Sequence, residues 1–127
     1  MLLVKKLNII LLFIVAVFAE NVPAPPDIPE VKAVYEHEQI KWLYVVPKYP
    51  CKIEDIDFTR IKEFNGYSNH CPHILVPLAA TILGTNIIEV HITSDKSGDF
   101  VDNPVSFDFN ELKNLVGLIR QAEKLSV

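Results

Sequence analysis

The chain has 127 residues, half of them hydrophobic, and a formal net charge of −4 at pH 7. This length is enough for one domain with a core that needs no disulfide. A negative net charge gives no long-range attraction for nucleic-acid phosphates or anionic lipid surfaces, so nucleic acid is excluded as an expected partner.

The first nineteen residues have the pattern of a signal peptide. Lys5 and Lys6 precede an apolar run from Leu7 to Phe18, which is too short to span a bilayer comfortably. Ala19 follows as a small residue suited to a cleavage site. We therefore expect residues 1–19 to be an export signal or a membrane anchor. The alternative is a segment that is not native to the domain behind it.

A linker and the first strand come next. Prolines gather between Pro23 and Pro29, which indicates a proline-rich linker over residues 20–37. The β-branched and aromatic run from Ile40 to Val46 predicts the first strand of a domain that spans residues 38–127, and Pro47 ends this strand.

The middle of the chain alternates between helical and extended patterns. The expected elements are a short helix over residues 54–64, an extended piece over residues 66–68, an apolar helix over residues 73–83, a strand over residues 86–92 and a polar loop over residues 93–104. The near-continuous hydrophobicity of the second helix implies that it is buried.

The last element is a helix with a clear start. Asp108 and Glu111 have the spacing of a capping box. Apolar residues from Leu112 to Leu125 recur with a period of about 3.6 and predict one buried stripe. Strand and helix thus alternate three times, and strands separated by helices require right-handed crossovers and a parallel sheet. The expected class is α/β.

Polar residues occur at the end of each expected strand: Tyr49 after the first, Ser68 and His70 at the second, and His91 at the third. Ligands of parallel α/β folds bind outside the carboxyl ends of the strands, so these residues are expected to share one face. Neutral imidazoles are good ligands for divalent metal ions, and His70 and His91 could chelate one ion. Hydrogen-bonded packing is the alternative for each histidine.

The sequence leaves the oxidation state of its two cysteines open. Cys51 and Cys71 could form one disulfide if the chain is exported, and two buried thiols are the alternative. His70 and His73 flank the second cysteine, but no second ligand pair at zinc-finger spacing accompanies them. A structural zinc site is therefore not expected.

Several segments together, in their order and spacing, identify a family. They are Tyr49-Pro50, residues 53–56, Gly66-Tyr67-Ser68-Asn69-His70, residues 76–80 with Leu83-Gly84, residues 87–93 with Glu89-Val90-His91, and Asp102 with the helix over residues 111–124. From Lys41 onward the chain resembles the sialic acid synthase family, which includes N-acetylneuraminate, legionaminate and pseudaminate synthases. The resemblance implies part of a TIM-type (β/α)8 barrel, with about three β/α units.

The resemblance also implies a reaction. Family members condense phosphoenolpyruvate with an N-acylmannosamine-type amino sugar in nonulosonic acid biosynthesis, with the help of Mn²⁺ or Mg²⁺. In this chain His70 and His91 would hold the metal ion. Ser68 would contact phosphoenolpyruvate, Tyr49 the sugar, and Asp102 the metal-bound water or sugar hydroxyls. Tyr49 and Asp102 would thus be catalytic as well as substrate-binding.

The part of the chain that resembles the family is shorter than a complete barrel, and this limits the expected enzymatic activity. A complete barrel takes about 250 residues, so three β/α units predict an incomplete enzyme, inactive alone, whose exposed sheet edges favour self-association or a complementing chain. The alternative is a secreted or membrane-tethered, non-enzymatic binding or assembly module. The family implies a cytoplasmic location, whereas residues 1–19 indicate export or a membrane tether, and the sequence leaves both locations open.

Overall fold

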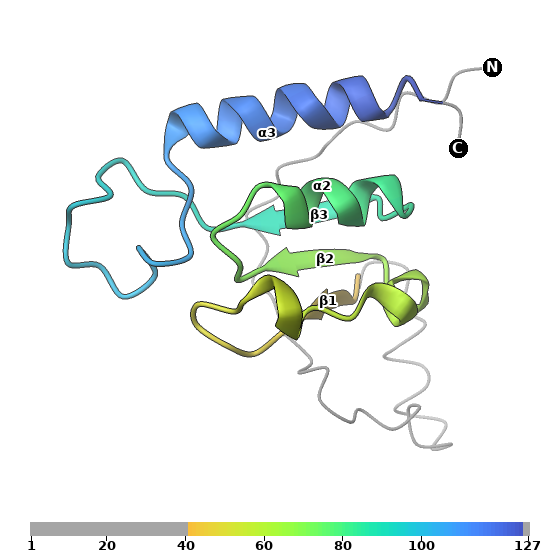
Figure 1. The fold of residues 1–127 in the computed structure, drawn as a ribbon, viewed down its shortest axis with the longest axis horizontal. Helices are drawn as coiled ribbons and strands as arrows, with labels where there is room; N and C mark the ends of the chain where they lie inside the picture. The colour runs from red at the N-terminus through yellow and green to blue at the C-terminus, as the bar shows by residue number, and fades with distance from the viewer. Residues whose placement is uncertain (1–40, 126–127) are drawn as a thin grey trace.

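Three short parallel strands form the sheet in the computed structural model, which describes residues 41–125 (Figure 1). The strands are β1 (Leu43–Val45), β2 (Gly66–Asn69) and β3 (Ile87–Val90). They lie in the order β1-β2-β3, and each pairs in parallel with the next. The prediction of an α/β fold with a parallel sheet is therefore confirmed. The segments expected over residues 1–37 lie outside the described residues.

Helical segments connect the strands and pack against one face of the sheet. They are the 3₁₀ helices η1 (Ile53–Asp55) and η2 (Phe58–Glu63), and the α-helices α2 (Leu75–Ile82) and α3 (Phe109–Ala122). Tyr44 of β1 and Tyr67 of β2 point to this face, where they share a buried cluster with Ile61, Val76 and Ala80. Since successive side chains of a strand point to opposite faces, Ser68 and Glu89 point the other way.

The prediction of one helix over residues 54–64 is wrong about the type of helix. The segment forms two 3₁₀ helices, because the Asp57 side chain accepts a hydrogen bond from the Thr59 amide and starts a new turn. The expected apolar face is nevertheless present: Ile61 is buried, and the rings of Phe58 and Phe64 lie 6.1 and 5.6 Å from the Tyr44 ring, in edge contact with it.

The apolar helix α2 is buried on one side only. Val76, Pro77 and Ala80 face the core, as expected, whereas Leu75 and Ile82 are 59% and 44% exposed. The expectation of complete burial was wrong because a helix packed on one sheet presents only one stripe to it. The helix ends before Gly84, whose φ of 104° is the left-handed conformation that favours glycine at a helix end.

The helix α3 begins at the predicted cap. The Asp108 carboxylate accepts hydrogen bonds from the amides of Asn110 and Glu111, and Glu111 accepts one from the Asp108 amide. The capping box is therefore confirmed. Leu115 and Ile119 of the predicted stripe are buried in a second cluster, whereas Leu125 lies beyond the helix and is 62% exposed.

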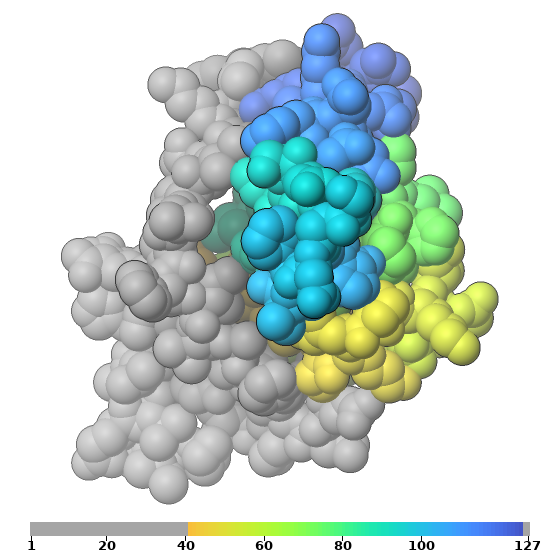
Figure 2. Space-filling view, turned by 90° about the vertical axis from the view of Figure 1, so that its left-hand side faces the viewer, coloured from red at the N-terminus to blue at the C-terminus, as the bar shows by residue number. Residues whose placement is uncertain are grey.

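The loop between β3 and α3 lies at the carboxyl ends of the strands. Figure 2 faces this end of the molecule and shows the loop, in teal to blue, between the yellow segment after β1 and the helix α3. An isolated parallel bridge between Ile92 and Phe107 ties the two ends of the loop to each other just beyond β3. Within residues 41–125, no helix is long and apolar enough to cross a membrane.

Candidate functional site

Four polar side chains line the face of the sheet opposite the helices. Ser68 and His70 are two residues apart at the end of β2, and Glu89 and His91 are two residues apart at the end of β3. Ser68 is the register partner of Glu89, so the two pairs lie side by side. The alternation of side chains along a strand therefore places all four on one face.

The two histidines meet at the carboxyl edge of the sheet. Their ring centroids are 5.5 Å apart, and the planes are inclined by 64°. His70 is buried, and His91 is partly exposed. The structure thus brings together the two residues that the sequence marked as metal-ligand candidates.

Tyr49 lies between the two imidazoles. Its hydroxyl oxygen is 2.9 Å from Nε2 of His70 and 3.3 Å from Nε2 of His91. Its ring lies over the His70 ring at a centroid distance of 4.1 Å, and the residue is 51% exposed. Burial, followed by the negative charges of Asp102 and Glu89, raises the pKa of Tyr49. The phenol is therefore neutral at physiological pH.

A backbone carbonyl fixes the orientation of His70. Nδ1 of this ring lies 3.0 Å from the carbonyl oxygen of Val46. A carbonyl oxygen can only accept, so Nδ1 carries the proton and Nε2 presents its lone pair. Burial lowers the pKa of His70, which favours the neutral form. A neutral imidazole whose second nitrogen is held by a carbonyl is the usual form of a metal ligand.

Carboxylates surround His91. Nδ1 lies 3.6 Å from Oδ2 of Asp102, and Nε2 lies 4.0 Å from Oε1 of Glu89. At this distance the Asp102 carboxylate lies beside Nδ1 of His91 without a hydrogen bond, whereas the Val46 carbonyl is hydrogen-bonded to His70. The backbone of Asp102 is held in turn, because its carbonyl accepts hydrogen bonds from the Ser106 amide and hydroxyl.

Glu89 is the site residue that the sequence analysis missed. The Ser68 hydroxyl donates a hydrogen bond of 2.5 Å to Oε2 of Glu89. Ser68 is buried, so this bond fixes the direction of the carboxylate. The available signal was its position two residues before His91 in a predicted strand, which places both side chains on the same face.

The cysteines lie beneath the site as free thiols. Cys51 and Cys71 are both buried. Burial, followed by the neighbouring Cys71, raises the pKa of the Cys51 thiol to about 12. Of the two states that the sequence left open, the structure contains two buried thiols. His73, two residues after Cys71, is exposed and takes no part in the site.

The residues present fit a divalent metal ion as a pair of ligands. Nε2 of His70 and Nε2 of His91 both face the Tyr49 hydroxyl, and the oxygens of Glu89 and Asp102 lie around His91. Imidazole nitrogens suit divalent transition-metal ions in general, and carboxylate oxygens suit Mn²⁺. No group of three or more histidine, cysteine, aspartate or glutamate side chains in the described part of the chain is arranged to hold an ion.

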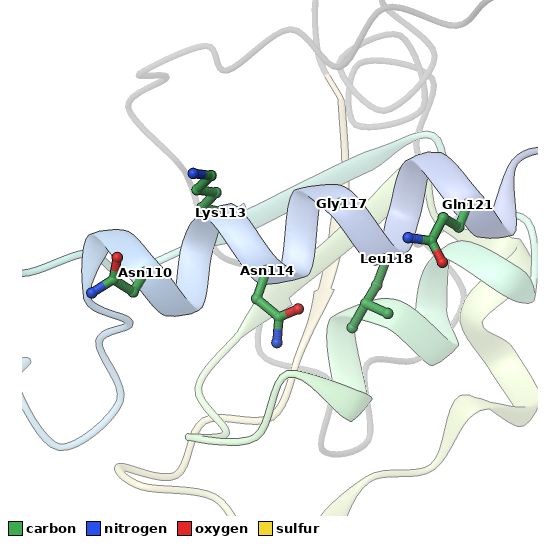
Figure 3. A pocket seen from close by; sticks show the side chains of 6 residues that line it. All are labelled: Asn110, Lys113, Asn114, Gly117, Leu118 and Gln121. Atoms are coloured by element: carbon green, nitrogen blue, oxygen red, sulfur yellow. The ribbon is translucent and has the colours of Figure 1, made fainter.

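A separate hollow lies along α3, away from this site (Figure 3). It encloses about 340 Å³ and is lined by Asn110, Lys113, Asn114, Gly117, Leu118 and Gln121. This lining contains no imidazole or carboxylate. The imidazole and carboxylate groups described above therefore lie at the strand ends and not in this hollow.

Comparison with known proteins gives one consistent result. The model of the NeuB family matches residues 26–126, so the match begins before Lys41. The chain is 41% identical over 88 residues to an N,N'-diacetyllegionaminic acid synthase from Legionella pneumophila, covering 64% of this chain and 25% of the relative. It is 36% identical over 95 residues to a pseudaminic acid synthase from Campylobacter jejuni, covering 69% of this chain and 28% of the relative.

A solved structure agrees with these sequence matches. The N-acetylneuraminic acid (sialic acid) synthetase from Leptospira borgpetersenii, crystallised with citrate, superimposes with a TM-score of 0.69 at 27% identity. The superposition covers 81% of this chain and 39% of that structure. The chain thus spans about a quarter of the length of the two curated relatives named above.

Proposed function

Because this chain belongs to the NeuB family of sialic acid synthases, we propose that it carries the metal-binding part of a synthase site, for the condensation of phosphoenolpyruvate with an N-acylmannosamine-type sugar. The observation that carries the proposal is the convergence of His70, His91 and Tyr49 at the carboxyl ends of β2 and β3. Ligands of parallel α/β folds bind at this end of the strands.

The two histidines are proposed to hold Mn²⁺ or Mg²⁺ through their Nε2 atoms. The bound ion would act as a Lewis acid on the aldehyde oxygen of the sugar. The protein's part is orientation: the Val46 carbonyl holds His70 by its Nδ1, and the Asp102 carboxylate lies beside Nδ1 of His91. The Nε2 atoms of both rings lie near one point, the Tyr49 hydroxyl, and this arrangement favours chelation of one ion over separate binding.

The polar residues around the histidines are proposed to contact the substrates. Tyr49 and Asp102 are half exposed at the rim of the site, where their oxygens can hydrogen-bond to sugar hydroxyls. Ser68 lies deeper and donates to Glu89; to contact phosphoenolpyruvate, whose phosphate and carboxylate oxygens accept hydrogen bonds, its hydroxyl would turn from Glu89 and donate to the ligand. Glu89 keeps a fixed carboxylate beside His91, where it can accept a proton or a hydroxyl hydrogen bond.

Binding of the phosphate group of phosphoenolpyruvate requires groups other than the site residues named above. None of the site side chains named above, all within residues 41–125, is a lysine or arginine. A phosphate is usually held by such cations or by backbone amides at a helix start. We therefore propose that the active site includes groups beyond the three described β/α units, from a complementing chain or a longer assembly.

Titration with Mn²⁺ tests the metal site. The free ion gives an electron paramagnetic resonance signal that is lost on binding, so the bound fraction can be followed directly. We expect the full chain to bind Mn²⁺ and the double variant His70→Ala/His91→Ala to lose this binding. His73→Ala removes an exposed histidine outside the site and should bind as the wild type does. Equally poor binding by wild type and double variant would contradict the proposal.

Substrate binding is tested on the same sample. Phosphoenolpyruvate or N-acetylmannosamine should change the spectrum of bound Mn²⁺, since positions of the ion are open to ligands. A spectrum that neither compound alters would argue against the substrates while leaving the metal site intact.

The secreted or tethered binding module remains the second candidate only as a sequence-based hypothesis. It depends on residues 1–19, which the structure does not describe, and the relatives named above are synthases. Fractionation of cells that produce a tagged chain would test it, with a purely cytosolic product of full length counting against export.

A further inference from the structure

The Tyr49 hydroxyl occupies the point that both metal-ligand candidates face. It lies 2.9 Å from Nε2 of His70 and 3.3 Å from Nε2 of His91, and both distances are those of hydrogen bonds. The two Nε2 atoms are the same ones that would bind an ion. Tyr49 and a metal ion would therefore use the same two nitrogen atoms.

The positions of the protons allow either the hydrogen bonds of Tyr49 to both histidines or the binding of an ion by both histidines, but not the two at once. A phenol has one proton, and the Nε2 lone pair of His70 accepts it, since the proton of His70 is on Nδ1 beside the Val46 carbonyl. The phenol oxygen can then only accept from His91, which requires the proton of His91 on Nε2. Chelation of an ion requires the opposite tautomer, with the proton on Nδ1 beside Asp102. His91 cannot serve both at once.

We propose that the Tyr49 hydroxyl competes with a divalent cation for His70 and His91 and so lowers the affinity of the site for metal. This inference rests on the proposed function. Binding of the ion breaks both hydrogen bonds, moves the proton of His91 from Nε2 to Nδ1 and releases the phenol into the site. The phenol then becomes free to contact a substrate, so metal entry and exposure of a substrate-binding group are one event.

The surroundings of Tyr49 permit this movement. The residue is 51% exposed and follows β1 in a loop, so its ring can turn toward solvent without leaving a cavity in the core. The ring contacts of Tyr49 are with the histidines themselves, at centroid distances of 4.1 and 5.8 Å. A water molecule can replace the hydrogen bonds that the hydroxyl gives up.

The variant Tyr49→Phe isolates the hydroxyl, because it keeps the ring over His70. We expect its dissociation constant for Mn²⁺ to be about three- to tenfold lower than that of the wild type, the factor for one or two competing hydrogen bonds. Tyr44→Phe is the matched control, since Tyr44 points to the opposite face of the sheet, and its affinity should equal that of the wild type. An unchanged or weaker affinity of Tyr49→Phe would overturn the inference.

Nitrogen NMR of the histidine rings gives a second measurement that needs no metal. In wild-type protein the His91 signals should show the proton on Nε2, and in Tyr49→Phe the population with the proton on Nδ1 should rise. Identical His91 tautomers in both proteins would overturn the inference.

The outcomes separate this inference from the proposed function. If wild type binds Mn²⁺ through its histidines and Tyr49→Phe binds equally well, the competition is refuted and the metal site stands. If neither protein binds, the metal site is refuted and the competition with it. Binding by Tyr49→Phe alone would support the competition most strongly.

Discussion

Each of the imidazoles of His70 and His91 has a protein oxygen beside its Nδ1 atom. The Val46 carbonyl and the Asp102 carboxylate lie there, at 3.0 and 3.6 Å. Since the first partner is backbone, it survives any substitution at position 46. Asp102 is a side chain on the loop after β3, so the orientation of His91 depends on that loop.

A buried thiol beneath the site gives the fold a pH dependence. Folding raises the pKa of Cys51 from 9.0 to about 12, chiefly through burial. The contribution of this group to stability is fully present below pH 9 and is lost as the pH rises toward 12, because the unfolded thiol ionises first. We therefore expect the free energy of unfolding, measured in urea from pH 8 to 11, to fall above pH 9.

The variant Cys51→Ser isolates that contribution. Serine does not ionise in this range, so the curve for the variant should fall less steeply above pH 9 than the wild-type curve. Parallel curves would mean that Cys51 does not contribute, and that other buried groups such as Tyr67, whose pKa is also raised by burial, cause the fall.

Sequence reasoning could place the histidines but not the contacts of Tyr49. Strand alternation and parallel pairing are enough to put His70 and His91 on one edge, since both rules depend only on position along the strand. The same rule would have found Glu89. The bridging position of the Tyr49 hydroxyl depends on the path of the loop after β1, and no periodic pattern encodes such a path.

At the level of the elements, caps were predictable and helix types were not. Asp108 and Glu111 satisfy each other's backbone amides within four residues, so the start of α3 is a local property. The division of residues 54–64 into two 3₁₀ helices depends on Asp57, whose side chain competes with the helical bonding pattern. Phe58 and Ile61, which follow Asp57, pack in the buried cluster on the sheet.

Alanine at Gly66 of β2 and alanine at Gly117 of α3 should change the stability of the fold in opposite directions. A Cβ on Gly66 would overlap Ile87 and Leu43 of the neighbouring strands, whereas a Cβ on Gly117 would meet nothing within 4 Å. We expect Gly66→Ala to destabilise the fold by about 1–3 kcal/mol through overpacking. Gly117→Ala should stabilise it by about 0.5–1 kcal/mol, since alanine restricts the unfolded chain and favours the helix. Urea unfolding of both variants would show this, and equal effects would contradict the close contact at Gly66.

At the scale of the whole molecule, the three β/α units correspond to part of a larger solved structure. The superposition on the Leptospira synthetase covers most of this chain and less than half of that structure. β3 lies at the edge of the described sheet, and edge strands favour pairing with further chains. Self-association or a complementing chain therefore remains a prediction, which light scattering of the purified chain across a range of concentrations would check.

Metal binding should stabilise the whole fold, because its two ligands come from different strands. His70 ends β2 and His91 follows β3, so an ion held by both links segments that only the folded chain brings together. A ligand that binds only the folded state adds about 2.7 kcal/mol at a hundredfold excess over its dissociation constant, which for a domain of this size raises the melting temperature by several degrees. Thermal unfolding with and without Mn²⁺ measures this directly. The rise should persist in His73→Ala and vanish in His70→Ala/His91→Ala, and a rise of the same size in the double variant would mean that the ion binds elsewhere.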